Sequence, residues 1–265
     1  MTALKLLPTA FMLMSSMAFS QSIPLGEEMV LCNCSLGSDT DPQVFQSYML
    51  NEFIPSTSSD PQTAIYLLQS DRGDNSGEFL LTYIAEKGHL SIASLVSDQM
   101  INSDNAELAT HPSEYLAGVS CTKYQLIGAN GFKQLPEVDL LGIHYIKVKQ
   151  DRSKEFEQLV VEKLHPTVGH LVHDMNLLYF KGVQGEYAGS YITLYAIESV
   201  AARERFWPTG GPEQEVVKQL FGQHVELAKE LSSYLVENSY LGPESGGGAA
   251  YFESLEWTDY LVLPP

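Results

Sequence analysis

The stretch Gly77-Glu78-Phe79-Leu80-Leu81-Thr82-Tyr83 returns later in the chain as Gly189-Ser190-Tyr191-Ile192-Thr193-Leu194-Tyr195. Each copy begins with a glycine that suits a turn and continues with apolar and aromatic residues, which is the pattern of the second arm of a β-hairpin. The copies lie 112 residues apart. This spacing indicates that one structural unit occurs twice.

A second pair of segments has almost the same spacing. Asn51-Glu52-Phe53-Ile54-Pro55 aligns with Glu162-Lys163-Leu164-His165-Pro166 at an offset of 111 residues. Because proline lacks a backbone N–H and restricts its neighbour, we predict that a helix ends at Pro55 and that another is interrupted at His165-Pro166. We divide the mature chain into repeat 1 (21–128), a linker (129–140) and repeat 2 (141–265).

Both repeats follow the order strand, helix, hairpin, helix, strand, as judged from the periodicity of their apolar residues. In repeat 2 we expect a strand at 143–149, a helix capped by Ser153, a hairpin of 176–181 and 190–197, a helix from Ser199, and a strand at 257–263. In repeat 1 we expect a strand at 30–34, a helix at 42–54, a hairpin of 63–69 and 78–85, a helix at 89–100, and a strand at 115–126.

This β-α-β-β-α-β order is ferredoxin-like, and such a unit leaves one apolar sheet face to be buried. The arrangement resembles the dimeric α/β barrel superfamily, with its stress-responsive and antibiotic-biosynthesis-monooxygenase branches. The most specific local likeness is the strand Ile143-His144-Tyr145-Ile146-Lys147-Val148-Lys149. The resemblance implies an α+β fold in which two tandem ferredoxin-like units pack sheet to sheet as an intramolecular α/β barrel, so that the chain is a monomer or a homodimer.

The first twenty residues have the features of a signal peptide. Lys5 precedes the apolar run Leu6–Met17, and Ala18-Phe19-Ser20 supplies small residues for cleavage before Gln21. The run is shorter than the roughly 20 residues that a membrane span needs. We therefore expect a secreted or periplasmic protein with no membrane anchor after cleavage.

The chain is strongly acidic, with 33 Asp and Glu against 15 Lys and Arg and a formal net charge of −18. Such a field repels nucleic acids and anionic membrane surfaces, so neither is an expected partner. The superfamily resemblance implies a small-molecule ligand as the partner.

Three cysteines follow the signal peptide, and export would permit a disulfide. Cys32 and Cys34 share one face of an expected strand, and either could meet Cys121 if its strand lies alongside. Buried thiols without a bond are the alternative.

Strong catalytic patterns are absent from the sequence: it has no Walker loop, GxGxxG, HExxH, GxSxG or CxxC. Glu253 and Glu256 could act as a carboxylate pair in a carbohydrate lyase or hydrolase.

Histidines are concentrated in repeat 2, which holds five of the seven. His144 shares a strand face with Ile146 and Val148, where an apolar surround could tune it for proton transfer. We take His144 as the candidate general acid or base, with a core histidine whose hydrogen bonds are satisfied as the alternative, and His165 and His170 as secondary polar groups. His170 and His173 could form a metal pair, but an exposed turn explains them as well, and we assign no metal site.

Aromatic residues in repeat 2 could line an apolar pocket around a ligand or cofactor. The candidates are Tyr179, Tyr191, Tyr195 and Trp207. Core packing is the alternative for each of them. Arg203 and Arg205 could bind a carboxylate or a haem propionate, although exposed arginines are common.

The superfamily resemblance implies a pocket between sheet and helices, as in cofactor-independent oxygenases of phenols and quinols, haem-binding and haem-degrading enzymes, cyclases and lyases. We therefore expect repeat 2 to bind an aromatic or haem-like ligand, with a cavity of a few hundred cubic ångströms near His144. The alternative is a non-catalytic interaction or stress protein whose pockets are filled by its own Tyr and Phe side chains.

Overall fold

The computed structural model describes most of the barrel and the helices that cover it. The described residues are 23–24, 27–57, 63–73, 77–85, 112–129, 134–135, 138–168, 175–206, 208–209, 225–235 and 257–263. The expected signal peptide and the expected helix at 89–100 lie outside them. So do His170, His173, Trp207, Glu253 and Glu256.

Four strands from each half of the chain form the main sheet, in equivalent order. The first half contributes β2 (Glu28–Leu36), β3 (Thr63–Gly73), β4 (Phe79–Ala85) and β5 (Leu116–Ala129), which lie side by side as β5-β2-β4-β3. The second half contributes β7 (Leu140–Ile146), β8 (Met175–Gly185), β9 (Tyr191–Ile197) and β10 (Trp257–Val262), in the order β10-β7-β9-β8.

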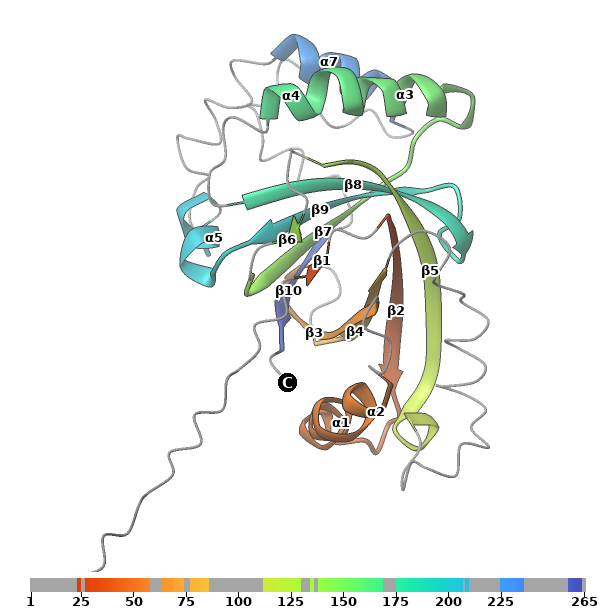
Figure 1. Cartoon of the computed structure of the whole chain (residues 1–265), viewed down its shortest axis with the longest axis vertical. Helices are drawn as coiled ribbons and strands as arrows, with labels where there is room; N and C mark the ends of the chain where they lie inside the picture. Colours follow the sequence, from red (N-terminus) through yellow and green to blue (C-terminus); the bar gives the residue numbers. More distant parts are fainter. Residues whose placement is uncertain are drawn as a thin grey trace, which may run out of the picture.

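The two halves join at two antiparallel seams, β5 with β8 and β10 with β3, and these close an eight-stranded barrel (Figure 1). The strand β7 begins three residues before the expected start at Ile143. A separate two-stranded sheet pairs β1 (Ile23–Pro24) with β6 (Gln134–Leu135), which lies within the expected linker.

Helical segments follow the first strand of each half. In the first half they are α1 (Pro42–Tyr48), a π-helical turn η1 (Met49–Phe53) and α2 (Ile54–Thr57). In the second half they are the 3-10 turn η4 (Gln150–Arg152), α3 (Ser153–Leu159), a π-helical turn η5 (Val160–Leu164) and α4 (His165–Val168).

The predicted helix end at Pro55 and the predicted break at His165-Pro166 are therefore wrong. In both halves the helix widens into a π turn just before the proline and then continues. A proline inside a helix removes one hydrogen bond and crowds the carbonyl four residues earlier. The wider turn, in which Ile54 N–H bonds to the carbonyl of Met49 and His165 N–H to that of Val160, accommodates the proline at the equivalent place in each half.

Three further helical segments are described: η3 (Pro112–Glu114), α5 (Val200–Phe206) and α7 (Val225–Tyr234). Ser199 caps α5 as expected, since its hydroxyl accepts a hydrogen bond from Ala202 N–H. Ser153 does not cap α3: the N-cap is Arg152, and the Ser153 hydroxyl bonds to the carbonyl of Gln150. Figure 1 shows α3, α4 and α7 covering one side of the barrel and α1 and α2 the opposite side.

The apolar residues separate into three clusters. One fills the inside of the barrel and combines both halves, with Tyr124 of the first half and Tyr260 of the second fully buried in it. The other two lie between the barrel and its helices, around Phe45 in the first half and around Phe156 in the second. The strands thus carry apolar side chains on both faces, because each face is covered.

A disulfide joins Cys32 on β2 to Cys121 on β5, and Cys34 is a buried free thiol. Cys32 and Cys121 stand directly opposite each other in the antiparallel pair. Of the two pairings left open for Cys121, the structure therefore selects Cys32. Among the described helices, none is both long enough and apolar enough to cross a membrane.

Candidate functional site

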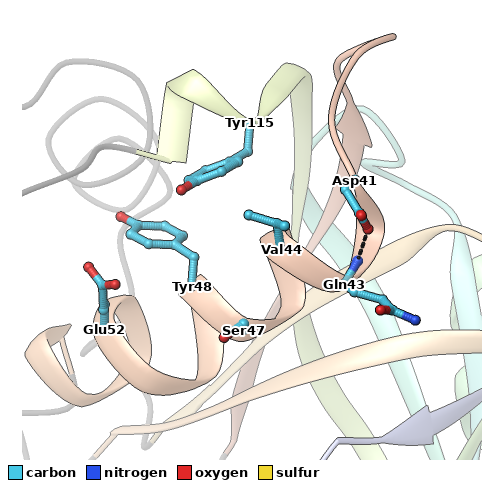
Figure 2. Close-up of a pocket in the computed structure, with 7 residues that line it drawn as sticks. All are labelled: Asp41, Gln43, Val44, Ser47, Tyr48, Glu52 and Tyr115. Carbon is cyan, nitrogen blue, oxygen red and sulfur yellow. Dashed lines mark hydrogen bonds between the residues drawn. The ribbon is translucent and has the colours of Figure 1, made fainter.

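Two of the surface hollows that described residues line lie against the outer side of a helix. The first, of about 310 Å³, is next to α1 (Figure 2). Its wall contains Tyr48 and Tyr115, whose ring centroids are 4.9 Å apart, and Asp41, whose carboxylate accepts a hydrogen bond from Gln43 N–H to cap α1. Its other lining residues are Val44, Ser47 and Glu52.

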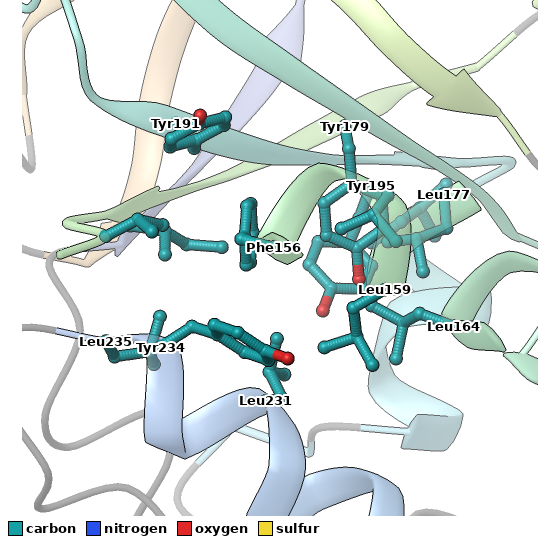
Figure 3. Packing of buried hydrophobic residues seen from close by; sticks show 14 of the residues in the cluster. Phe156, Leu159, Leu164, Leu177, Tyr179, Tyr191, Tyr195, Leu231, Tyr234 and Leu235 are labelled. Atoms are coloured by element: carbon teal, nitrogen blue, oxygen red, sulfur yellow. The ribbon is translucent and has the colours of Figure 1, made fainter. Parts of the chain in front are cut away.

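The second hollow, of about 390 Å³, runs along α3. It is lined by Lys154, Glu157, Gln158, Val161 and Glu162. His144 lines neither hollow, so neither is the cavity that we expected beside it. The space between the second-half strands and their helices is instead occupied by the apolar cluster around Phe156, which Figure 3 shows between the sheet, α3 and α7.

His144 lies on β7 with its ring on the helix-facing side of the sheet. Its neighbours at alternate positions, Leu140 and Ile146, belong to the cluster around Phe156. The side chain is buried, and its ring centroid is 4.8 Å from that of Tyr195. Burial lowers the pKa of His144 to about 3, because the charged imidazolium is poorly solvated there. The imidazole is therefore neutral at physiological pH.

Thr193 lies next to His144 and was not singled out from the sequence. On β9 it stands directly opposite His144 of β7 on one side and Tyr179 of β8 on the other. Thr193 is fully buried, and no hydrogen-bond partner for its Oγ1 is found among the described residues. The strand alternation places residue 193 on the same face as Tyr191 and Tyr195, but it could not show that the hydroxyl lacks a partner.

His165 is the last member of this row of polar side chains, and it lies on a helix rather than on a strand. It is the first residue of α4, is only 8% exposed, and has its ring centroid 5.2 Å from that of Tyr179. Burial lowers the pKa of His165, and a hydrogen bond to the backbone of Ala129 partly offsets this effect. Within the described part of the chain, its Nε2 has no hydrogen-bond partner.

The structure thus brings together His144, Tyr195, Thr193, Tyr179 and His165 on the helix-facing side of the second-half strands. We call this set the polar row. Buried polar atoms are nearly always hydrogen-bonded in folded proteins. The described residues supply no hydrogen-bond partner to Thr193 Oγ1 or His165 Nε2, and buried atoms of this kind often contact a ligand or water.

Tyr191 has a different environment from the rest of the predicted aromatic set. Its hydroxyl donates a hydrogen bond of 2.7 Å to Glu157 Oε1, which also accepts one of 2.7 Å from Lys181 Nζ. The ring is fully buried edge-on against Phe156. The Tyr191 hydroxyl is therefore already engaged by an ion pair.

Arg203 is likewise engaged. It is buried, and its guanidinium contacts three carboxylates, those of Asp71, Asp259 and Glu204. A ligand carboxylate would have to compete with all of them. Arg205 is exposed on the same helix.

The first half has no polar row at the equivalent place. There Cys32, Leu81 and Leu67 stand opposite one another on β2, β4 and β3, where the second half has His144, Thr193 and Tyr179. Tyr83 occupies the position of Tyr195, and its buried hydroxyl also lacks a partner among the described residues. No histidine accompanies it on these strands. The described residues contain no group of three or more His, Cys, Asp or Glu side chains that could hold a metal ion.

No family model matches the chain, and no curated protein matches it in sequence. Solved structures do share its fold. One is an anthrone oxidase-like protein, which is 12% identical, with 89% of this chain and 91% of that chain covered and a TM-score of 0.50. Another is a candidate monooxygenase from Lactobacillus acidophilus NCFM, which is 10% identical, with 89% and 93% covered and a TM-score of 0.51. The chain therefore has the fold of these α+β barrels.

Proposed function

We propose that the second half of this protein binds a small aromatic molecule at the polar row and oxygenates it without a cofactor of its own. The observation that carries the proposal is the hydroxyl of Thr193, which is fully buried, lacks a partner among the described residues and stands directly opposite His144. A hydroxyl in this position has an unused donor and acceptor beside a neutral imidazole. The donor and the acceptor of the Thr193 hydroxyl could each bind the hydroxyl group of a phenol or quinol.

The row supplies the groups that such a reaction needs. Neutral His144 can accept a proton from the substrate, and the negative charge that develops next to it stabilises the imidazolium. Thr193 can donate a hydrogen bond to the substrate oxygen as it becomes an oxyanion. The electron-rich substrate then reacts with O₂. When a CH₂ group is oxidised to a carbonyl, one oxygen atom enters the product and the other leaves as water.

The fold supports this proposal in a general way. The anthrone oxidase-like protein and the candidate monooxygenase share the barrel, although their low identity says nothing about individual residues. The contrast between the halves supports the location. The polar row occurs in the second half, whereas the equivalent strands of the first half carry Cys32, Leu81 and Leu67.

Haem, which the superfamily resemblance also implies, fits the described residues less well. His165 Nε2 could ligate the iron. The arginine expected to bind a propionate, Arg203, is held instead by Asp71, Asp259 and Glu204. The described residues therefore do not support a propionate contact at Arg203, and we assign no step to haem.

The test is to measure O₂ consumption and product formation with a panel of tricyclic phenols and anthrones, for the wild-type protein and for His144→Ala and Thr193→Val. We expect turnover by the wild type, at least a hundredfold loss in His144→Ala, and a smaller loss in Thr193→Val. Adding haem and recording the Soret band provides a parallel readout. Turnover that survives in His144→Ala would refute the role given to this residue.

The non-catalytic alternative also has an observation in its favour. Tyr179, Tyr191 and Tyr195 all pack into the cluster around Phe156, as they would if the protein filled its own pocket. If no compound of the panel binds and none is turned over, this alternative replaces our proposal.

We also propose that the two halves are tandem ferredoxin-like units and that the protein is exported. The equivalent strand orders and the π turns before Pro55 and Pro166 support the duplication. The disulfide between Cys32 and Cys121 supports export, since disulfides persist in oxidising compartments. Mass spectrometry of the mature protein from the native cell would test both cleavage after Ser20 and the location.

A further inference from the structure

We propose that the hollow beside α1 binds a small methylated ammonium cation, held by the rings of Tyr48 and Tyr115 and by the carboxylate of Glu52. The hollow belongs to the first half of the chain, on the side of the barrel opposite α3, α4 and α7 (Figure 1). It is therefore separate from the polar row, and it neither requires nor supplies a step of the proposed oxygenation.

The two tyrosine rings form one aromatic surface in the wall of the hollow. Their centroids are 4.9 Å apart and their planes are inclined by 33°, so a ligand cannot enter between them. Tyr48 is buried and Tyr115 is partly exposed, and both line the hollow. The face of a tyrosine ring has a negative electrostatic potential that attracts cations. The wall therefore favours a cation that has apolar surface to place against the rings.

The described side chains that line the hollow carry negative charge only. They include the carboxylates of Asp41 and Glu52 and no Lys, Arg or His. The first half has two described basic side chains, Arg72 and Lys123, and each is paired with a carboxylate elsewhere. The hollow beside α3 differs in this respect, because Lys154 is part of its lining. A cation thus has no charged competitor among the described residues of the hollow beside α1.

Glu52 is the carboxylate that lies next to the rings. It follows Tyr48 by about one helical turn, and Figure 2 shows its carboxylate on the same side as the Tyr48 hydroxyl, with Asp41 at the other end of the hollow. Burial raises the pKa of Tyr48, and the negative charges of Glu52 and Glu114 raise it further. A cation bound at this end would offset the negative potential that these carboxylates produce.

The hollow is preformed, because the segments that carry its two rings are bonded to each other. The carbonyl of Tyr115 accepts hydrogen bonds from Gly37 N–H at 2.8 Å and from Thr40 Oγ1 at 2.9 Å. Thr40 directly precedes the cap of α1, so these bonds hold the end of η3 against the start of α1. A site that is already formed loses less conformational entropy when a ligand binds.

Among cations, the lining favours a methylated ammonium. The described residues contain no group of three or more His, Cys, Asp or Glu side chains that could hold a metal ion. A primary ammonium is a compact and strongly hydrated charge, whereas methyl groups spread the charge and pack against aromatic rings. Val44 adds apolar surface, and Gln43 and Ser47 add polar groups that can bind a hydroxyl on the ligand. The volume of about 310 Å³ fits a small molecule.

The test is calorimetric titration of the purified protein with choline and with 3,3-dimethylbutan-1-ol, which has the same shape but no charge. Choline should bind at least roughly tenfold more tightly at low ionic strength. Nuclear Overhauser effects should connect its N-methyl groups to the ring protons of Tyr115, whose resonances are assigned with Tyr115→Leu. Equal affinities for the two compounds, or no binding of choline, would overturn the inference.

Three variants test the location of the site. Glu52→Gln removes the charge but keeps the size of the side chain, so choline should bind roughly fivefold more weakly while the neutral alcohol is unaffected. Tyr115→Leu should weaken choline binding by a similar factor. Glu162→Gln is the matched control, because it removes an equal charge from the hollow beside α3, and it should bind choline like the wild type.

Thermal unfolding confirms that each variant is folded. An equal loss in Glu52→Gln and Glu162→Gln would assign choline binding to the net charge of the protein and overturn the site. A choline affinity that neither Glu52→Gln nor Tyr115→Leu changes would overturn it as well.

Discussion

Arg203 and Asp259 form a buried ion pair that ties a helix to a seam of the barrel. Arg203 Nη1 lies 3.4 Å from Asp259 Oδ2, and both side chains are nearly inaccessible to solvent. The same Nη1 also contacts Asp71 on β3, so one guanidinium links strands from both halves of the chain. A second arginine also contacts Asp259: Arg72 Nη2 lies 2.8 Å from Asp259 Oδ2. Even so, burial raises the pKa of the Asp259 carboxyl above its usual range.

Replacing Arg203 with Met should destabilise the protein by about 2–4 kcal/mol, because Asp259 and Asp71 would remain at the seam with less positive charge to stabilise them. The loss should be smaller than for a carboxylate left entirely alone, since Arg72 still contacts Asp259. The measurement is the free energy of unfolding from urea titration. Lys163→Met is the control: Lys163 pairs with Glu230 on the solvent-exposed surface, so a much smaller change than in Arg203→Met is expected. Equal stability of Arg203→Met and the wild type would show that the network contributes nothing to the seam.

The disulfide between Cys32 and Cys121 links residues 89 apart in sequence. A cross-link that closes a loop of this size restricts the unfolded chain, which corresponds to roughly 4.6 kcal/mol in the loop-entropy description. We expect reduction with dithiothreitol to lower the free energy of unfolding by about this amount. The double variant Cys32→Ala/Cys121→Ala should be insensitive to dithiothreitol, whereas Cys34→Ala should keep the sensitivity of the wild type. Loss of the sensitivity in Cys34→Ala would mean that Cys34 is the bonded partner.

Periodicity predicted the order of the eight barrel strands, but it did not predict the separate pair of β1 and β6. Alternating apolar residues placed the strands to within a few residues, and the glycines predicted the hairpin turns. Gly73, Gly77, Gly185 and Gly189 all adopt positive φ values, which side chains of other residues disfavour. The pairing of Cys121 stayed open because Cys32 and Cys34 point to the same face, and only the register of β2 against β5 distinguishes them.

Other features depend on contacts between distant segments and could not be predicted from local pattern. The helices continue past Pro55 and Pro166 because a π turn relieves the clash, which local proline rules do not anticipate. The sequence pattern indicates only that Thr193 lies on a strand. The register of β7 against β9 is needed to show that it stands opposite His144. Arg203 looked like a surface arginine, and its carboxylate partner Asp71 lies 132 residues earlier in the chain.

Tyr191 and Tyr195 should respond differently to removal of the hydroxyl. Tyr191→Phe removes a hydrogen bond to Glu157 and should cost about 1 kcal/mol of stability, but it should leave ligand binding unchanged. Tyr195→Phe keeps the ring that contacts His144 but removes the hydroxyl of a member of the polar row, so we expect altered affinity or turnover instead. Unfolding titrations and ligand titrations on both variants make the comparison. If Tyr191→Phe weakened ligand binding as strongly as Tyr195→Phe, the hydroxyl of Tyr191 would have to be counted in the site.

His144 should make the stability of the protein depend on pH in the acid range. The unfolded chain protonates this residue near its ordinary pKa of 6.5, whereas the folded protein does so only at about 3. Between these values the unfolded state binds more protons than the folded state, so stability falls as pH decreases, by up to roughly 1.4 kcal/mol per pH unit. Below about pH 3 both states are protonated and this contribution no longer changes.

His144→Gln cannot titrate, so its free energy of unfolding should fall less steeply than that of the wild type between pH 6 and 4, a range taken from the two pKa values. The carboxylates titrate in both proteins and cancel in the difference between the two curves. Parallel curves would mean that the ring takes up its proton as readily in the folded protein as in the unfolded chain, and the neutral base proposed at the polar row would then have no basis.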